Sequence, residues 1–287
     1  MEMIIEDRTN IRDSSLLENL VRYAEIMQCI NACYDDEIII DLSRIQFAYP
    51  LFLNLLLITK DADKRISFRN TTTYLDTIMF PEAINIERLC TLTRVKTYLP
   101  LIADKPCEEN VIETSLPNII ANLISEVAGI KSNVTGGIRY ILQELIDNVN
   151  EHSLAERFYV MVQAYPNKQF VDVCIADNGK GLRYSYEKAG VKLENDVEAM
   201  ALMASAVSSK ERPENESRGY GLFTSRKMST EGLEGEFLCA SGHAVYVKKR
   251  NKESVLSLPF CETKGTVVAM RIKYNISNFN IYNYLEY

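Results

Sequence analysis

The chain has 287 residues, 47% of them hydrophobic and 25% charged, which is typical of a folded protein long enough for two domains. Its formal net charge of −7 argues against a broad surface for nucleic acid or acidic membranes. Seven cysteines without a CxxC pair, together with only two histidines, argue against a zinc site and a disulfide framework.

No segment has the pattern of a membrane anchor or an export signal. The longest apolar run, Leu51 to Ile58, is interrupted by Asn54 and is too short to span a bilayer. The N-terminus is too acidic and too briefly apolar for a signal peptide. Because scattered thiols fit a reducing compartment, we expect a cytoplasmic protein. From the net charge and the short apolar runs, we expect that it binds neither nucleic acid nor membranes.

Helix and strand patterns alternate in the first half of the chain. Apolar spacing predicts helices at 14–31, 50–63 and 71–80, and β-branched runs predict strands at 37–42 and 66–69. Asp13 or Ser14 is available as the N-cap of the first helix, and Pro81 ends the third. This order predicts a small α/β layer domain over residues 1–105.

The second half has mainly antiparallel strand patterns, with its helices grouped together. Strands are expected at 97–102, 159–164, 170–176, 236–240, 244–249, 254–258 and 266–272, and helices at 116–127, 138–151, 195–207 and from Leu222. Pro166-Asn-Lys joins two of these strands as a hairpin. The order predicts an α+β fold, with a two-layer sandwich over residues 106–278 and a loosely docked tail at 279–287.

The first of three motifs with ligand chemistry is Glu144-Leu-Ile-Asp-Asn148. Glu144 and Asn148 are four residues apart and therefore share one helix face. An amide oxygen suits Mg²⁺, so Asn148 is the expected metal ligand, and Glu144, one turn earlier, is the expected catalytic base. Taken alone, this pattern is more often a solvated helix face.

The second motif, Asp177-Asn-Gly179-Lys-Gly181, follows a predicted strand. A carboxylate at a strand end can accept a hydrogen bond from the exocyclic amine of adenine, and the glycines let the backbone approach a flat ring. A simple polar turn is the alternative, because Asp-Asn-Gly is common turn chemistry.

The third motif, Gly219-Tyr220-Gly221-Leu222, leads into a predicted helix. Free backbone N–H groups and the positive end of the helix dipole favour phosphate at such a place. The motif is not a Walker loop, since GxxxxGK[ST] occurs nowhere in the chain. A flexible loop before a helix is the alternative interpretation.

In their order and spacing, the motifs resemble the GHKL ATPase family, which has the Bergerat fold of gyrase and the histidine kinases. The matching residues are Glu144 and Asn148 in the N box, Asp177, Gly179 and Gly181 in the first glycine box, and Gly219, Gly221 and Leu222 in the second. Lys264-Gly-Thr266 matches the third box, where a Thr hydroxyl helps to hold adenine. The resemblance covers about residues 115–275 and implies ATP and Mg²⁺ as ligands, with 182–218 as a mobile lid.

Within that family, the N box is most like that of anti-sigma-factor serine kinases and related ATP-binding regulators. Sensor histidine kinases usually have Asn where this chain has Glu144, and they need a phosphoacceptor His on an upstream helix. The chain has only His152, inside the N box, and His243, between two late strands. Autophosphorylation on histidine is therefore not expected.

The N-terminal half resembles STAS domains, which occur in anti-sigma-factor antagonists. The resemblance rests on Ile38-Ile-Ile-Asp41-Leu-Ser-Arg-Ile-Gln-Phe47 and covers about residues 10–95. Where such antagonists carry an Asp-Ser phosphoacceptor, this chain has Tyr49-Pro-Leu-Phe52, so no phosphorylation switch is expected there. An unrelated α/β module is the alternative.

Three functions follow from these resemblances. The first is an ATP-binding regulatory protein, either a slow ATPase or a nucleotide-dependent switch, with a protein partner for its N-terminal domain. The second is a protein serine/threonine kinase of the anti-sigma-factor type, and the third is a non-catalytic nucleotide-binding module. A homodimer is compatible with the family.

Overall fold

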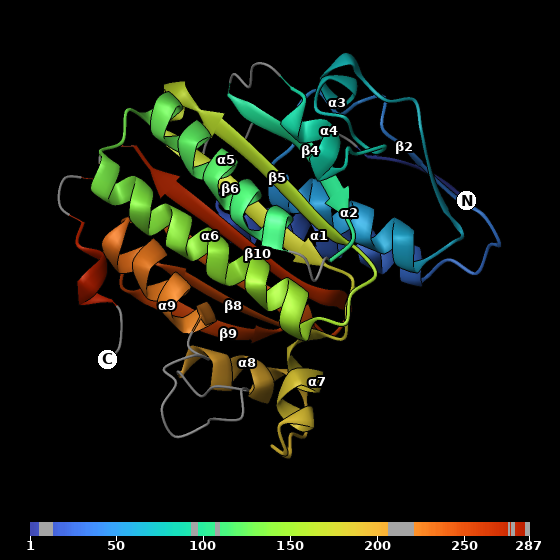
Figure 1. Cartoon of the computed structure of the whole chain (residues 1–287). Coiled ribbons are helices and arrows are strands. Elements are labelled where there is room, and N and C mark those ends of the chain that lie inside the picture. The colour runs from blue at the N-terminus through green and yellow to red at the C-terminus, as the bar shows by residue number, and fades with distance from the viewer. Residues whose placement is uncertain are drawn as a thin grey trace.

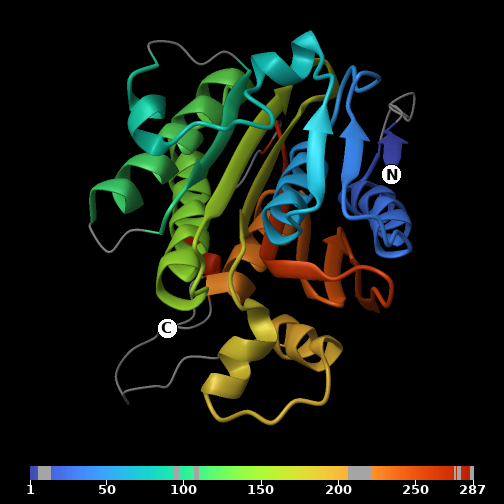
Figure 2. The same ribbon diagram turned by 90° about the vertical axis from the view of Figure 1, so that its right-hand side faces the viewer.

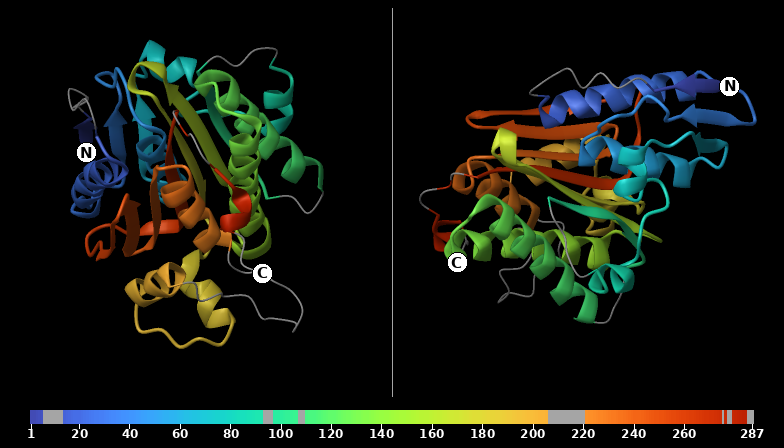
Figure 3. Two further views of the ribbon diagram at one scale, coloured as in Figure 1. Left: turned by 90° about the vertical axis from the view of Figure 1, so that its left-hand side faces the viewer. Right: turned by 90° about the horizontal axis from the view of Figure 1, so that it is seen from above.

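The computed structural model describes residues 1–5, 14–92, 97–106, 110–205, 221–274, 276 and 279–284, with the backbone alone at 110–114, 132 and 152. Within these ranges the chain has three layers, with a large antiparallel sheet between two layers of helices (Figure 1; Figure 3). The mixed α/β class expected from the sequence is confirmed. The third layer was not expected, and it comes from the first half of the chain.

The large sheet has seven antiparallel strands in the order β4-β5-β6-β10-β7-β8-β9. They are β4 (Tyr98–Asp104), β5 (Phe158–Tyr165), β6 (Phe170–Asp177), β7 (Glu236–Gly242), β8 (Ala244–Lys249), β9 (Lys252–Ser257) and β10 (Thr263–Lys273). β5 and β6 form the expected hairpin. Every residue of β6 is buried, because helices cover both faces of the sheet.

Helices α5 (Asn110–Ala128), α6 (Ser132–His152) and α9 (Gly221–Lys227) cover the face that is turned toward the viewer in Figure 1. α6 buries an apolar stripe at helical spacing, which includes Val134, Ile138, Ile141, Leu145 and Val149. This helix begins before the predicted 138, since Gly136 and Gly137 lie inside it.

The C-terminal segment is docked on α6. Phe279 is buried, and its ring stacks on that of Tyr284 with centroids 5.8 Å apart. A Cβ at Gly137 or Gly232 would lie 2.1 or 2.6 Å from the Phe279 ring, so both glycines make room for it. The Asn133 amide also donates to the Phe279 carbonyl at 2.8 Å. The described part of the tail is therefore anchored, where a loose tail was expected.

Helices α1 (Leu16–Asn31) and α2 (Pro50–Ala62) cover the opposite face, beside a small parallel sheet (Figure 2). That sheet consists of β1 (Glu2–Ile4), β2 (Ile38–Asp41) and β3 (Ile66–Arg69). The N-cap of α1 is Ser15, which forms a capping box with Glu18, and not Asp13 or Ser14 as predicted.

One apolar core spans the two halves of the chain on this opposite face. It joins residues of α1 and α2 with the side chains that β5, β6, β7 and β10 direct toward them, among them Tyr159, Met161, Cys174 and Leu238. Asn54 of α2 also donates to the Cys174 carbonyl of β6 at 3.3 Å. The domain boundary at residue 105 stays a prediction. β4 lies before that boundary in the sequence, but it pairs with β5 in the large sheet.

Four further α-helices lie in the described chain. They are α3 (Thr73–Thr77), which is shorter than the predicted 71–80, α4 (Ile86–Cys90), α7 (Gly181–Lys188) and α8 (Asp196–Ala204). α7 and α8 lie together at one end of the sheet and form the first part of the segment predicted to be a lid (Figure 1). Its remainder, 206–218, lies outside the described residues. In the described chain, no helix has both the length and the apolar character needed to cross a bilayer.

Candidate functional site

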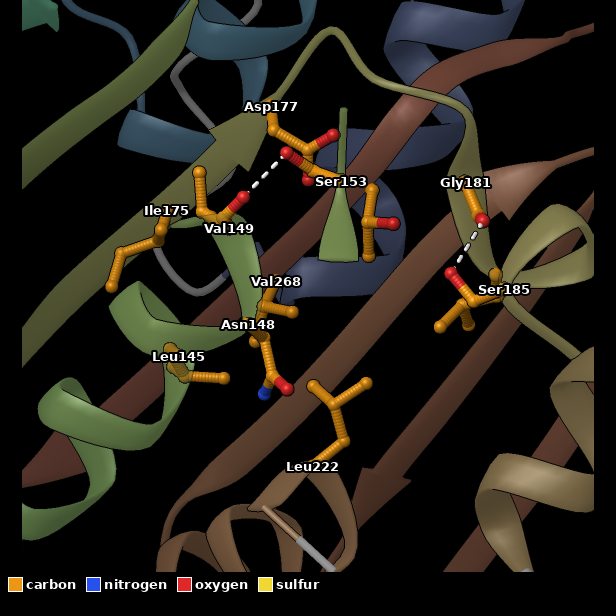
Figure 4. A pocket seen from close by; sticks show the side chains of 12 residues that line it. Leu145, Asn148, Val149, Ser153, Ile175, Asp177, Gly181, Ser185, Leu222 and Val268 are labelled. Carbon is orange, nitrogen blue, oxygen red and sulfur yellow. Dashed lines mark hydrogen bonds between the residues drawn. The ribbon is translucent and has the colours of Figure 1, made fainter. Parts of the chain in front are cut away.

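A pocket opens where β6 ends, between the C-terminal half of α6 and the first turns of α7 and α9 (Figure 4). It encloses about 570 Å³ including its open mouth. Its polar lining consists of Asn148, Ser153, Asp177, Ser185 and Thr266. Its walls are otherwise apolar, with Leu145, Val149, Ile175, Leu182, Leu222 and Val268. This combination of apolar walls and a few polar groups is typical of small-molecule sites.

The Asp177 carboxylate lies at one end of this pocket and is almost completely buried. Burial raises the pKa of Asp177 to about 7, although hydrogen bonds from the N–H groups of Gly179 and Thr266 favour the charged form. The Gly179 bond measures 2.8 Å. At Gly265, with φ +64°, a Cβ would lie 2.1 Å from the Asp177 carbonyl oxygen, so only glycine lets the two turns approach so closely.

The glycine turn after Asp177 is fixed by the loop that follows α6. The Asn178 side chain accepts hydrogen bonds from the N–H groups of Glu156 and Arg157, at 3.0 and 2.9 Å. The Lys180 N–H donates to the Ser153 carbonyl oxygen at 2.8 Å. This turn is therefore preorganised by backbone contacts.

Asn148 and Glu144 lie at the α9 end of the site, close to Gly221. A Cβ at Gly221 would lie 2.4 Å from Glu144 Oε2 and 3.3 Å from Asn148 Nδ2, so α9 begins directly against both side chains. Asn148 points into the pocket beside Leu222 (Figure 4). Its Nδ2 is buried and has no hydrogen-bond partner among the described residues, which leaves it available to a ligand.

Glu144 has a partner on its own helix. The Tyr140 hydroxyl, one turn earlier, hydrogen-bonds to the Glu144 carboxylate. Burial and this negative neighbour together raise the pKa of Tyr140. Tyr140 therefore stays a neutral phenol beside Glu144.

The donor set at this end suits a hard cation that keeps most of its waters. Within the part of the chain that the structure describes, no cluster of three or more His, Cys, Asp or Glu side chains could hold a metal by itself. The neighbouring Asn148 amide and Glu144 carboxylate are oxygen donors of the kind that Mg²⁺ accepts alongside substrate phosphates. These two residues therefore fit Mg²⁺ brought by a nucleotide better than a resident metal.

The structure brings most of the predicted site residues together. Asn148, Asp177, Gly181, Leu222 and Thr266 line the pocket, and Glu144, Gly179 and Gly221 lie directly behind that lining. Gly219 and Tyr220 lie outside the described residues.

Several lining residues were not predicted, although the sequence carried a signal for some of them. Ile175 is two residues before Asp177 on the same strand, and Val268 is two residues after Thr266, so each shares a sheet face with a predicted residue. Ser153 and Ser185 had no such signal, because loop and helix geometry bring them to the pocket.

The sequence was compared with protein-family models and with curated proteins, and neither comparison gave a match.

Proposed function

We propose that this protein is an ATP-binding regulatory protein with a Mg-ATP site of the GHKL type. The observation that carries the proposal is that one pocket is lined by residues from all of the matched motifs. α6 contributes Asn148, β6 contributes Asp177, the start of α9 contributes Leu222, and β10 contributes Thr266. These four positions are far apart in the sequence, and chance would not be expected to gather them around one cavity.

The Asp177 end suits adenine. A charged carboxylate accepts a hydrogen bond from the exocyclic amine, and the Thr266 side chain lies beside it in the same lining. The apolar walls, including the paired residues Ile175 and Val268, would contact the ring. A small aromatic ligand would therefore be recognised by one buried charge and by shape.

The Asn148 end suits the phosphates and their metal ion. Mg²⁺ bound with ATP would neutralise phosphate charge, and Asn148 would supply its amide oxygen to the ion. Glu144 would accept a proton from an attacking water. Slow hydrolysis or a nucleotide-dependent switch is the outcome that we propose for this pocket.

The N-terminal layer, which resembles a STAS domain, is the proposed contact for a protein partner. α2 packs beneath β6, the strand that ends at Asp177, so a change at the pocket reaches that layer through direct contacts. A protein serine/threonine kinase uses the same pocket, and γ-phosphate transferred to a partner protein would identify it. A cytoplasmic location and a homodimer stay predictions.

Isothermal titration calorimetry with Mg-ATP and Mg-ADP tests the proposal. We expect Asp177→Asn to weaken ATP binding by about 10- to 100-fold, because the amide offers a donor to the adenine amine. Asp36→Asn, at an exposed acid far from the pocket in the sequence, is the matched control and should bind as the wild type does. Absent binding in the wild type, or equal binding in wild type and Asp177→Asn, would contradict the proposal.

A further inference from the structure

Ser241, near the end of β7, is a buried serine outside every motif described above. Its hydroxyl oxygen accepts a hydrogen bond from the Leu182 N–H at 2.9 Å. The same hydroxyl donates to the Gly265 carbonyl oxygen at 2.7 Å. One side chain thus connects the first turn of α7 with the turn that precedes Thr266.

Both ends of this bridge belong to the pocket wall. Gly181 and Leu182 line the pocket on the α7 side, and Thr266 lines it on the β10 side. Gly181, with φ +78°, lies so close to the bridge that a Cβ there would be 2.6 Å from Ser241 Oγ. The position of α7 relative to β10 is therefore set at this hydroxyl.

The same hairpin also holds α8. The His243 N–H donates to Asp196 Oδ2, at the first residue of α8, over 2.8 Å. At Gly242, with φ +58°, a Cβ would lie 2.3 Å from that oxygen, so the close approach of the hairpin and α8 requires glycine. Residues 241–243, which join β7 to β8, thus fix the starts of both helices.

We propose that Ser241 is a positioning residue for the nucleotide: its hydroxyl holds the α7 wall and the Gly265–Thr266 turn at the spacing that the adenine ring needs. This inference rests on the proposed function. It also assigns a role to the first part of the predicted lid. α7 is held in place as a fixed wall of the pocket.

Removal of the hydroxyl would leave the Leu182 N–H and the Gly265 carbonyl without their partner, and the two turns would separate. The Thr266 N–H donates to the Asp177 carboxylate, so a displaced turn would weaken that bond as well. Asp177 would then become harder to ionise, and nucleotide binding, which uses its charged form, would need a higher pH. The neighbouring Cys239 thiol stays neutral over this range, because burial raises its pKa to about 12.

The test compares Ser241→Ala with Ser229→Ala by calorimetry with Mg-ATP between pH 5.5 and 8.5. Ser229 is a fully buried serine whose hydroxyl also donates to a backbone carbonyl, that of Ser225 at 2.6 Å, so it controls for loss of a buried hydroxyl. We expect Ser241→Ala to bind ATP about tenfold more weakly at pH 7.5 and to shift the midpoint of the pH profile upward. Ser229→Ala should keep both values of the wild type.

Asp196→Asn provides a second reading of the same hairpin if Ser241→Ala does not fold. It weakens the contact between α8 and His243, and we expect a threefold or greater loss of ATP affinity. If Ser241→Ala folds and keeps the ATP affinity and the pH midpoint of the wild type, the positioning role is overturned and the nucleotide site stays intact. If Ser241→Ala does not fold, wild-type ATP affinity in Asp196→Asn has the same meaning. Absent ATP binding in the wild type itself would overturn the proposed function and this inference with it.

Discussion

The buried carboxylate of Asp177 makes a prediction in which stability and binding change in opposite directions. Without a ligand, the folded protein holds this group in an apolar pocket with two backbone N–H donors, and burial raises its pKa to about 7. Asp177→Asn keeps the shape and keeps an acceptor for the Gly179 N–H, but it removes the charge. We expect the variant to be more stable than the wild type at pH 8 and to bind ATP more weakly.

The size of the effect follows from the difference between the folded and unfolded pKa. The ordinary value for this carboxyl is 3.8, and the folded value is about 7. At about 1.4 kcal/mol for each pH unit, the charged form costs the ligand-free fold about 4 kcal/mol. Because the folded pKa is the higher one, this cost is absent below pH 4, grows as the pH rises from 4 to 7, and is complete at pH 8.

Urea unfolding at pH 4, 6 and 8 measures this difference directly. The unfolding free energies of Asp177→Asn and wild type should agree at pH 4 and separate steadily toward pH 8, where the variant is more stable. Asp36→Asn should follow the wild type at all three values. If the difference in unfolding free energy between Asp177→Asn and wild type is no larger at pH 8 than at pH 4, the charged carboxylate does not destabilise the fold and this reasoning is refuted.

Three further predictions concern the reaction, the tail and the two halves of the chain. Glu144→Gln should reduce ATP-dependent phosphate release at least tenfold with little change in ATP affinity. The control Glu151→Gln, at an exposed side chain, should release phosphate as the wild type does. Equal rates in the two variants would contradict the assignment of Glu144 as the base. Phe279→Ala should lower the unfolding free energy by about 3 kcal/mol in urea titrations, because it leaves a cavity beside α6. An equal loss in Tyr282→Ala, whose side chain is 66% exposed, would contradict that reason. A chain of residues 106–287 should lack a cooperative thermal transition by circular dichroism, since it loses β4 and exposes the apolar face that α1 and α2 cover; a sharp transition would support an independent domain from residue 106.

Much of the candidate site was predictable because its chemistry lies in short motifs. The spacing of Glu144 and Asn148 determines their shared helix face before any tertiary contact is known. Asp177 follows a strongly apolar strand, which predicts a carboxylate at a sheet end. The sequence could not show that Ser241 joins the two glycine turns, because that contact depends on how β7 and β10 pair.

The three-layer arrangement was less predictable, although one signal was present. β6 carries Val171, Val173 and Ile175 on one face, and Phe170, Cys174 and Ala176 on the other beside the buried Asp172, a mainly apolar pattern that is typical of a strand covered on both sides. An alternating pattern would be expected if one face met solvent. α7 was not predicted, because its sequence is largely polar and lacks the apolar spacing of a helix. The contacts of Ser241 with α7 and of Asp196 with His243 hold this region in place.

The most direct test of the nucleotide site is a structure determined with Mg²⁺ and a non-hydrolysable ATP analogue. We predict that the adenine amine lies within hydrogen-bond distance of the Asp177 carboxylate and that the phosphates lie at the Asn148 end of the same pocket. A nucleotide bound elsewhere, or a pocket that stays empty at saturating analogue, would contradict it.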